Sequence, residues 1–214
     1  HRVPSPGELA EARECVGMDS VHLDAENFTV LFERPGVRVD LGAIGKGFAL
    51  EIASEIFRET GVTSALIHGG TSTVCAIGSP PDEAFWKTAI EHPGWGQPGA
   101  VILEHERLVA VAKLRDESFS VSAVWGRAFE DGGVYYGHVL DPRCGQPTQN
   151  ALLAAVSLPS GTAADAWSTA LLVSGEAGVA ALGQVGESAR SLLLLPDDAS
   201  GFRTLNDGFD LQKR

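Results

Sequence analysis

Short runs of apolar residues, many of them alternating with polar residues, recur along most of the chain and are typical of half-buried strands. They predict strands at residues 21–23, 28–32, 64–67, 73–77, 86–90, 108–112, 119–122, 153–157, 192–195 and 202–205. Apolar positions at helical spacing predict helices at residues 4–17, 48–60, 163–173 and 176–182. Hairpins with a few inserted helices do not form a βαβ series, so we expect an α+β fold with mostly antiparallel or mixed sheet.

A glycine-rich stretch, residues 40–47, lies between two of these elements. The alternating residues 37–39 predict a strand that leads to Asp40, and the helix at residues 48–60, whose wide apolar face we expect to pack against sheet, follows directly. Glycines permit positive φ angles and close approach to a ligand, and the free amide groups of a helix N-terminus suit phosphate. With Lys46 as a nearby cation the stretch indicates a phosphate site, although an ordinary strand-to-helix turn capped by Asp40 fits the pattern equally well.

The overall composition is that of a globular protein, with 44% hydrophobic and 21% charged residues. The net charge of −12 argues against nucleic acid or an anionic membrane surface as a partner. A phosphate ligand would therefore need local help from amide groups, placed cations or a metal. No apolar run reaches membrane-spanning length, and we find no signal peptide. The cysteines, Cys15, Cys75 and Cys144, lack metal-site spacing and do not indicate a disulfide scaffold.

Asp165 and Thr169 stand four positions apart in the predicted helix at residues 163–173, so both side chains project from one face. A carboxylate beside a hydroxyl is a pair of hard oxygen donors that suits Mg²⁺ when a phosphate supplies further oxygens. The alternative is structural: the helix dipole then favours Asp165, and Thr169 packs against its neighbours. Because Asp165 lies near the predicted helix start and outside the predicted core, we expect an Asp165→Ala variant to remain folded.

Two further places combine polar residues and glycine at the end of a predicted strand. His138 precedes a polar loop at residues 141–147, where a general base is often mounted, but a lone histidine is more often structural. Asp141 could order that loop through an Asx-turn. Gly69 and Gly70 permit either close approach of a ligand or a simple bulge.

Taken in order, these motifs resemble those of the ApbE family of FAD:protein FMN transferases. Residues 40–47 are similar to the family's Asp-Leu-Gly-Gly-Ile-Ala-Lys-Gly loop, and residues 138–147 to its His-Ile-Leu-Asp-Pro-Arg-Thr-Gly-x-Pro signature. Residues 164–170 resemble its Ala-Asp-Ala-x-Ser-Thr-Ala helix. Residues 65–70 resemble its strand ending in Gly-Gly, and residues 86–93 its Trp-x-x-x-Ile-x-x-Pro element. Because the motifs keep their order over most of the chain, the resemblance is specific.

The resemblance implies an ApbE-like α+β fold and an enzyme that uses Mg²⁺ and takes FAD as its substrate. Such an enzyme cleaves the FAD pyrophosphate, releases AMP and esterifies FMN onto a threonine or serine of an acceptor flavoprotein. By position, the resemblance implies flavin-nucleotide contacts at Asp40, Gly42, Lys46, Gly69, Gly70 and His138. It implies metal ligands at the Ala43 backbone carbonyl and at the side chains of Asp165 and Thr169. His138 is also the implied catalytic base for the acceptor hydroxyl.

The chain also departs from the family pattern. We expect a single domain over residues 1–214, truncated at its N-terminus relative to the family, which would open one side of the flavin pocket. The family's Thr-Ser-Gly step is replaced at residues 121–123, Trp125 takes the aromatic place, and Thr71 follows the Gly-Gly pair. Two alternatives to the transferase therefore stay open: an Mg²⁺-dependent FAD pyrophosphatase that releases FMN and AMP, and a non-catalytic flavin-binding remnant. The resemblance implies a bacterial envelope or periplasmic location, and without a signal peptide a cytoplasmic one stays open as well.

Overall fold

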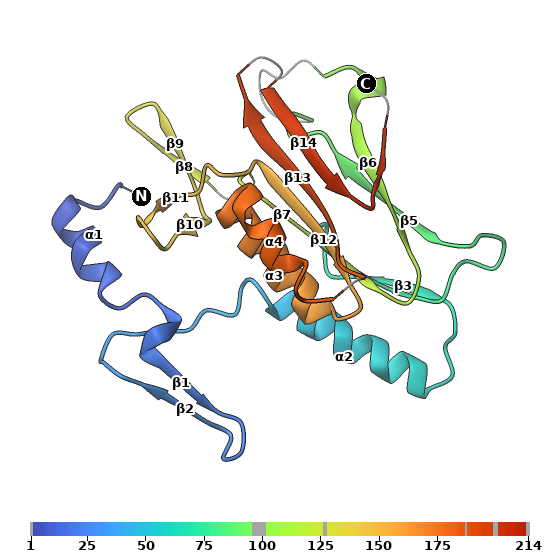
Figure 1. Ribbon diagram of the computed structural model, residues 1–214, viewed down its shortest axis with the longest axis horizontal. Helices are drawn as coiled ribbons and strands as arrows, with labels where there is room; N and C mark the ends of the chain where they lie inside the picture. Colours follow the sequence, from blue (N-terminus) through green and yellow to red (C-terminus); the bar gives the residue numbers. More distant parts are fainter. Residues whose placement is uncertain (1, 96–101, 126–127, 187, 199–200, 213–214) are drawn as a thin grey trace. The chain divides into compact units, whose positions relative to one another are not determined.

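The computed structural model describes residues 2–95, 102–125, 128–186, 188–198 and 201–212 (Figure 1). The chain divides into two compact units. Unit 1 contains His1–Leu41 and Gly126–Thr148, and unit 2 contains Gly42–Trp125 and Gln149–Arg214. The expectation of one domain over the whole chain stays a prediction. Among the described residues, no helix is both long and apolar enough to span a membrane.

Unit 2 is built on a six-stranded sheet with the order β14-β13-β12-β7-β4-β3, in which every neighbouring pair is antiparallel. Its strands are β3 (Ala65–His68), β4 (Thr73–Ile77), β7 (Ser118–Ala123), β12 (Leu153–Leu158), β13 (Arg190–Asp197) and β14 (Gly201–Asp207). A second, three-stranded antiparallel sheet has the order β15-β6-β5. Its strands are β5 (Trp86–Glu91), β6 (Leu108–Leu114) and β15 (Asp210–Leu211), and a short 3₁₀ turn, η2 (Glu104–Glu106), precedes β6.

The apolar core of unit 2 contains side chains from both sheets. Ile90 and Leu114 come from the smaller sheet, whereas Phe119, Leu153 and Leu192 come from the larger one, and all five are buried. Since side chains alternate across a strand, the neighbouring residues of the larger sheet point to its other face. That other face is covered by helices.

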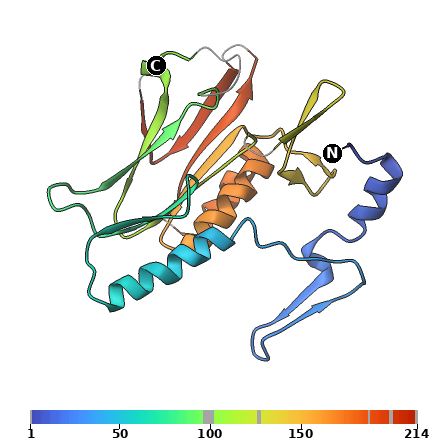
Figure 2. The same ribbon diagram turned by 180° about the vertical axis from the view of Figure 1, so that it is seen from behind.

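Two helices, α2 (Gly45–Glu59) and α3 (Gly161–Ser174), cover this second face, and α3 is followed by η3 (Gly175–Gly178) and α4 (Val179–Leu182). Helix α3 packs against β7 and β12, while α2 packs against α3 and β4. The N-terminal turns of α2 and α3 meet in both views (Figures 1 and 2). The face of α2 that is buried is narrower than expected. It contains Gly47, Leu50 and Ser54, whereas the apolar residues Phe48, Ile52, Ile56 and Phe57 are 41–56% exposed.

Unit 1 consists of short elements. They are α1 (Pro6–Arg13), η1 (Met18–Ser20), β1 (Val21–Asp24), β2 (Thr29–Phe32), β8 (Ala128–Asp131), β9 (Val134–Gly137), β10 (Leu140–Asp141) and β11 (Gln146–Pro147). Three antiparallel hairpins result: β1–β2, β8–β9 and β10–β11. Gly132 and Gly133 join β8 to β9 with φ angles of 60° and 81°, which only glycine adopts without strain in such a tight turn.

The structure confirms the α+β class and every strand predicted from the first group of alternating runs, with shifts of one or two residues at some ends. The strand predicted at residues 37–39 is wrong. This segment is irregular in the structure and pairs with none of the described strands, although Val37 is buried. Alternation reports that one side of a segment is covered, but not that a neighbouring strand offers hydrogen bonds.

Candidate active site

Asp165 lies at the centre of a polar cluster in unit 2, where α3 meets the N-terminus of α2. Its side chain is almost completely buried, with the residue 2% exposed. The Gly47 amide donates a hydrogen bond of 3.0 Å to Asp165 Oδ2, and the Ser120 hydroxyl donates one of 3.0 Å to Oδ1. Lys46 Nζ lies 3.6 Å from Oδ1. A buried carboxylate needs such partners, because an unpaired charge in the interior is very costly.

This burial corrects the sequence-based argument that Asp165 lies outside the core. The residue is in the second turn of α3, facing the sheet, and its carboxylate completes the start of another helix. Ile44, the N-cap of α2, provides no side-chain cap, so the Asp165 carboxylate satisfies a first-turn amide of α2 in its place. An alanine at residue 165 would leave that amide without this acceptor. It would also remove the nearer acceptor of the Ser120 hydroxyl, whose other acceptor is the Ser72 carbonyl at 3.3 Å.

Glu51 of α2 performs the reciprocal function for α3. Its Oε2 accepts hydrogen bonds of 2.9 Å from the Thr162 amide, 2.5 Å from the Thr162 hydroxyl and 3.0 Å from the Ser160 hydroxyl. Partial burial raises the pKa of the Glu51 carboxyl, but the hydrogen bonds from Thr162 and Ser160 outweigh it, so the pKa lies below its ordinary value. Ser160 is the N-cap of α3. Thr162, the second residue of α3, does not cap the helix but bonds a carboxylate that is remote in sequence.

Close contact between Gly47 and Gly161 makes this double capping possible. A Cβ atom on Gly47 would lie 2.1 Å from the Gly161 carbonyl oxygen, and one on Gly161 would lie 2.7 Å from the Gly47 oxygen. Neither distance is attainable for a real side chain. Neither Gly45 nor Gly47 has a positive φ. Gly47 therefore serves helix packing, and not the left-handed backbone conformation that we expected for this loop.

Asp165 continues into a chain of side-chain hydroxyls, which we call the hydroxyl cluster: Thr73, Ser120, Ser122, Ser168 and Thr169. Ser120 Oγ lies 3.1 Å from Thr73 Oγ1. Ser122 Oγ lies 2.8 Å from Ser168 Oγ and 2.9 Å from Thr169 Oγ1. The Ser168 hydroxyl donates a bond of 2.9 Å to the Asp165 carbonyl oxygen. The cluster therefore connects the carboxylate to the Thr169 hydroxyl through the interior.

Our sequence analysis missed the serines of this cluster as site residues, although their pattern is visible. Ser118, Ser120 and Ser122 alternate along β7 with the apolar residues of the core face. A row of serines on a strand face that another element covers predicts a polar partner on that element, because buried hydroxyls are normally hydrogen-bonded. The partner is α3, which presents Asp165 and Thr169 to this row.

The donors present fit a hard divalent cation such as Mg²⁺. A carboxylate has about four lone-pair positions. Asp165 Oδ2 accepts from the Gly47 amide, whereas Oδ1 accepts from Ser120 and Thr73 and lies near Lys46, and Thr169 adds a neutral oxygen. In the described part of the chain, no three His, Cys, Asp or Glu side chains form a metal-binding group. A cation here would thus take its other ligands from backbone and phosphate oxygens. The Ala43 carbonyl, expected from the family resemblance, is one such backbone oxygen. That assignment stays a prediction.

The other predicted residues of unit 2 lie in two turns. Gly42 and the half-buried Ala43 belong to the turn that leads into α2. Gly69 and Gly70 form part of the turn between β3 and β4. The Gly69 amide donates a bond of 2.9 Å to the Thr73 carbonyl oxygen, and Gly70 has a φ of 77°. Glycine at residue 70 is therefore required by the turn itself, whatever else it contacts.

Asp40 and His138 belong to unit 1, and both are exposed. His138 lies two residues before β10 and the loop that Asp141 orders. The Asp141 carboxylate accepts a bond of 2.9 Å from the Arg143 amide and pairs with the Arg143 guanidinium, and its carbonyl accepts one of 2.7 Å from the Gly145 amide. The expected Asx-turn is present, and its side-chain hydrogen bond comes from the Arg143 amide. Asp141 is thus a structural residue of the loop that follows His138.

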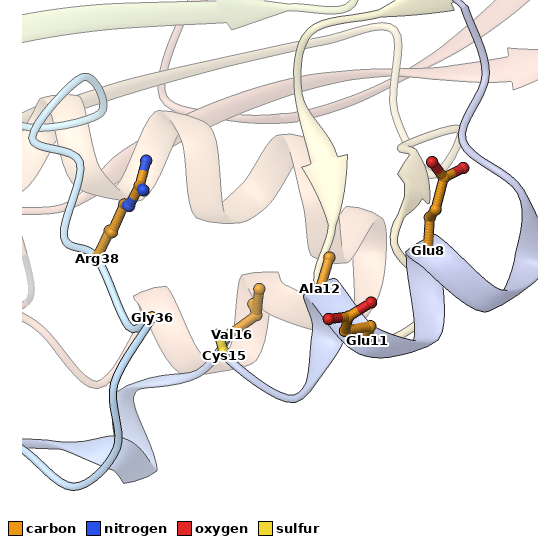
Figure 3. A pocket seen from close by; sticks show the side chains of 7 residues that line it. All are labelled: Glu8, Glu11, Ala12, Cys15, Val16, Gly36 and Arg38. Carbon is orange, nitrogen blue, oxygen red and sulfur yellow. The ribbon is translucent and has the colours of Figure 1, made fainter.

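An open pocket of about 470 Å³ lies in unit 1. Figure 3 shows Glu8, Glu11 and Ala12 on α1, with Arg38 on the segment that follows β2. The remaining lining residues are Cys15, Val16 and Gly36. None of the site residues predicted from the sequence is among the described residues that line it.

Comparison with known proteins agrees with the fold and with the family resemblance. The model of the ApbE family matches residues 1–190. The FAD:protein FMN transferase of Rhodobacter capsulatus is 34% identical over 182 residues, which cover 82% of this chain and 31% of that protein. The one from Haemophilus influenzae is 32% identical over 177 residues, covering 81% of this chain and 49% of that protein.

A solved structure has the same architecture. The ApbE protein of Thermotoga maritima superimposes with a TM-score of 0.79 at 27% identity, covering 96% of this chain and 62% of that chain. The present chain belongs to the ApbE family. It spans about a third of the Rhodobacter relative and about half of the Haemophilus relative.

Proposed function

We propose that this protein is an Mg²⁺-dependent FAD:protein FMN transferase. The observation that supports this most is the buried Asp165 carboxylate at the N-terminus of α2, with the Lys46 ammonium 3.6 Å away and Thr169 one turn further along α3. It combines oxygen donors for a cation with a helix N-terminus and a lysine that suit a diphosphate. Relatives that are 34% and 32% identical to this chain bear the name of this activity.

In the proposed reaction, the hydroxyl oxygen of an acceptor threonine or serine attacks the phosphorus atom of the FMN half of FAD. The pyrophosphate bond breaks, AMP leaves with the bridging oxygen, and a phosphoester joins FMN to the acceptor. His138 takes the hydroxyl proton, as the family resemblance implies. Lys46 and the amide groups before α2 bind the phosphates, and Asp40 contributes a further contact to FAD. Bound Mg²⁺ would neutralise the charge of the diphosphate.

The residues of unit 2 that would hold the cation are the Ala43 carbonyl, Asp165 and Thr169. Gly42 and the Gly69–Gly70 turn would line the approach of FAD without side chains of their own. With a net charge of −12 the protein repels an anionic substrate at long range. The local positive groups at the start of α2 are thus essential to the proposal.

The proposal is tested by incubating the 214-residue chain with FAD and Mg²⁺ and measuring AMP by chromatography. We expect AMP release that stops on chelation and that falls in a Thr169→Val variant, since valine keeps the shape but lacks the ligand oxygen. Exposed Glu55 of α2 offers a control, and Glu55→Gln should release AMP at the original rate.

Adding an acceptor flavoprotein separates the remaining alternatives. A transferase releases AMP in step with covalent labelling of the acceptor, whereas a pyrophosphatase releases AMP and free FMN whether or not the acceptor is present. A chain that binds FAD but releases no AMP under any of these conditions would be the non-catalytic flavin-binding protein, and the proposal would be wrong.

A further inference from the structure

The hydroxyl cluster has a defined direction of hydrogen bonding, because each hydroxyl has a single proton. Ser168 Oγ lies 2.9 Å from the Asp165 carbonyl oxygen, which can only accept. Its alternative acceptor, Ser120 Oγ, is more distant at 3.4 Å. In either arrangement the Ser168 proton points away from Ser122. The 2.8 Å contact between Ser122 and Ser168, in which the geometry alone lets either oxygen donate, is then donated by Ser122.

This direction passes on to Thr169. Since Ser122 has used its only proton on Ser168, it can only accept in its 2.9 Å contact with Thr169 Oγ1. Thr169 therefore donates to Ser122, with its proton directed into the protein. Its oxygen lone pairs are then left available for a cation. If Thr169 instead kept its proton on the cation side, that proton would oppose metal coordination.

We infer that Ser122 is a positioning residue that accepts the Thr169 proton and so makes Thr169 an oxygen donor for Mg²⁺. The inference rests on the proposed function, in which Thr169 is a metal ligand, and adds to it the residue that sets the orientation of that ligand. Ser122 itself does not contact substrate or metal in this account. Removal of the residue that orients a metal ligand typically lowers metal affinity by about 10–100-fold.

The same strand offers a matched control. Ser118 lies on the same face of β7 as Ser122, four residues away, and is 1% exposed. Within the described part of the chain, its Oγ atom has no hydrogen-bond partner. Ser118→Ala therefore deletes a buried hydroxyl of the same size from the same strand without changing the cluster.

The experiment measures Mg²⁺ affinity of the whole chain by titration calorimetry without FAD, with Mn²⁺ and its electron paramagnetic resonance signal as a second probe. We expect Ser122→Ala to lower the affinity by about 10–100-fold and Ser118→Ala to leave it unchanged. Ser122→Thr keeps an accepting hydroxyl and should restore the affinity. Ser122→Cys fills the position with a weak acceptor and should not restore the affinity. The cysteine variant keeps the test valid if the alanine variant unfolds.

The outcomes separate this inference from the proposed function. Unchanged Mg²⁺ affinity in Ser122→Ala or Ser122→Cys would overturn the inference alone. A parent protein that binds Mg²⁺ with the expected dependence on Ser122 but transfers no FMN would support the inference and refute the transferase. Absence of Mg²⁺ binding by the parent protein would overturn the metal assignment, and the role of Ser122 with it.

Discussion

At the scale of single residues, Asp165 combines a structural and a proposed chemical role. Its carboxylate accepts from the Gly47 amide and the Ser120 hydroxyl, and it lies beside Lys46. The Gly47 amide and the Ser120 hydroxyl are buried and would lose this acceptor if the carboxylate were removed. A loss of activity on mutating Asp165 therefore says little about metal binding unless the stability of the variant is measured as well.

We predict that Asp165→Ala lowers the free energy of unfolding by about 1–3 kcal/mol for each buried partner it leaves unsatisfied, contrary to the expectation from the sequence. Asp165→Asn keeps an accepting oxygen and should lose less stability. Urea unfolding without metal measures both. Exposed Glu55→Ala should change the stability by less than about 0.5 kcal/mol. Equal urea midpoints for Asp165→Ala and the parent protein would show that the carboxylate is not needed for folding.

His138 provides the residue-scale test of the proton acceptor. We predict that His138→Ala still binds Mg²⁺, and still binds FAD through Lys46 and the start of α2, but transfers FMN about 10²–10⁴-fold more slowly. Single-turnover transfer to an acceptor, followed over the range of about pH 6 to 9, measures the effect. Transfer at the parent rate throughout that range would leave His138 with a structural role only.

At the scale of elements, α2 and α3 cap each other. Asp165 of α3 bonds the first turn of α2, and Glu51 of α2 bonds the first turn of α3. Gly47 and Gly161 allow the two N-termini to approach closely enough for both bonds. The position of the candidate metal ligands is thus determined by how two helices meet, and not by a loop.

Substituting the glycine at this crossing should disturb both helices. We predict that Gly47→Ala lowers the free energy of unfolding by about 1–3 kcal/mol, because a Cβ would lie 2.1 Å from the Gly161 carbonyl oxygen and the helices must separate. Gly45→Ala is the matched control, since a Cβ there meets nothing within 4 Å. The control should be neutral or stabilising by up to about 1 kcal/mol in thermal or urea unfolding. Similar effects of the two substitutions would contradict the close crossing.

The Glu51 cap should be sensitive to acid. Its pKa in the folded protein lies below the ordinary value of 4.5, so its stabilisation is complete above that value and is lost as the pH falls through the folded pKa. We predict that Glu51→Gln loses about 0.3–1 kcal/mol at neutral pH, because a charge at a helix N-terminus is removed. The difference from the parent should vanish in strong acid. Thermal unfolding between about pH 7 and pH 3 measures it, with Glu55→Gln as the control. A difference that persists in acid would exclude the charged cap.

Local pattern predicted more of the fold than of the site. Alternation along β7 is clear because one of its faces packs in the core, whereas β4 and β12 are apolar runs buried along nearly their whole length, and all three strands are confirmed. The bonds from Asp165 to Gly47 and from Glu51 to Thr162 join residues more than a hundred positions apart. No local periodicity contains such contacts, so the reciprocal capping of α2 and α3 could not be placed from sequence alone. The serine row on β7 is visible in the sequence, but its partners on α3 are not.

At the scale of the whole molecule, an acidic chain with a net charge of −12 is proposed to bind and cleave an anionic dinucleotide. The chain also covers only part of the relatives that it matches. Its family membership and its α+β fold are established, whereas catalysis depends on whether this chain assembles a working site. A stability or metal-binding measurement does not test that question, because neither follows the transfer of FMN.

Covalent labelling of an acceptor tests the central claim most directly. The chain is incubated with FAD, Mg²⁺ and an acceptor flavoprotein, and flavin fluorescence of the acceptor is measured after denaturing electrophoresis. The account predicts a fluorescent acceptor band that is absent with chelator and absent when the acceptor threonine or serine is replaced by alanine. An unlabelled acceptor, in the presence of intact protein and bound FAD, would contradict the assignment of this chain as an FMN transferase.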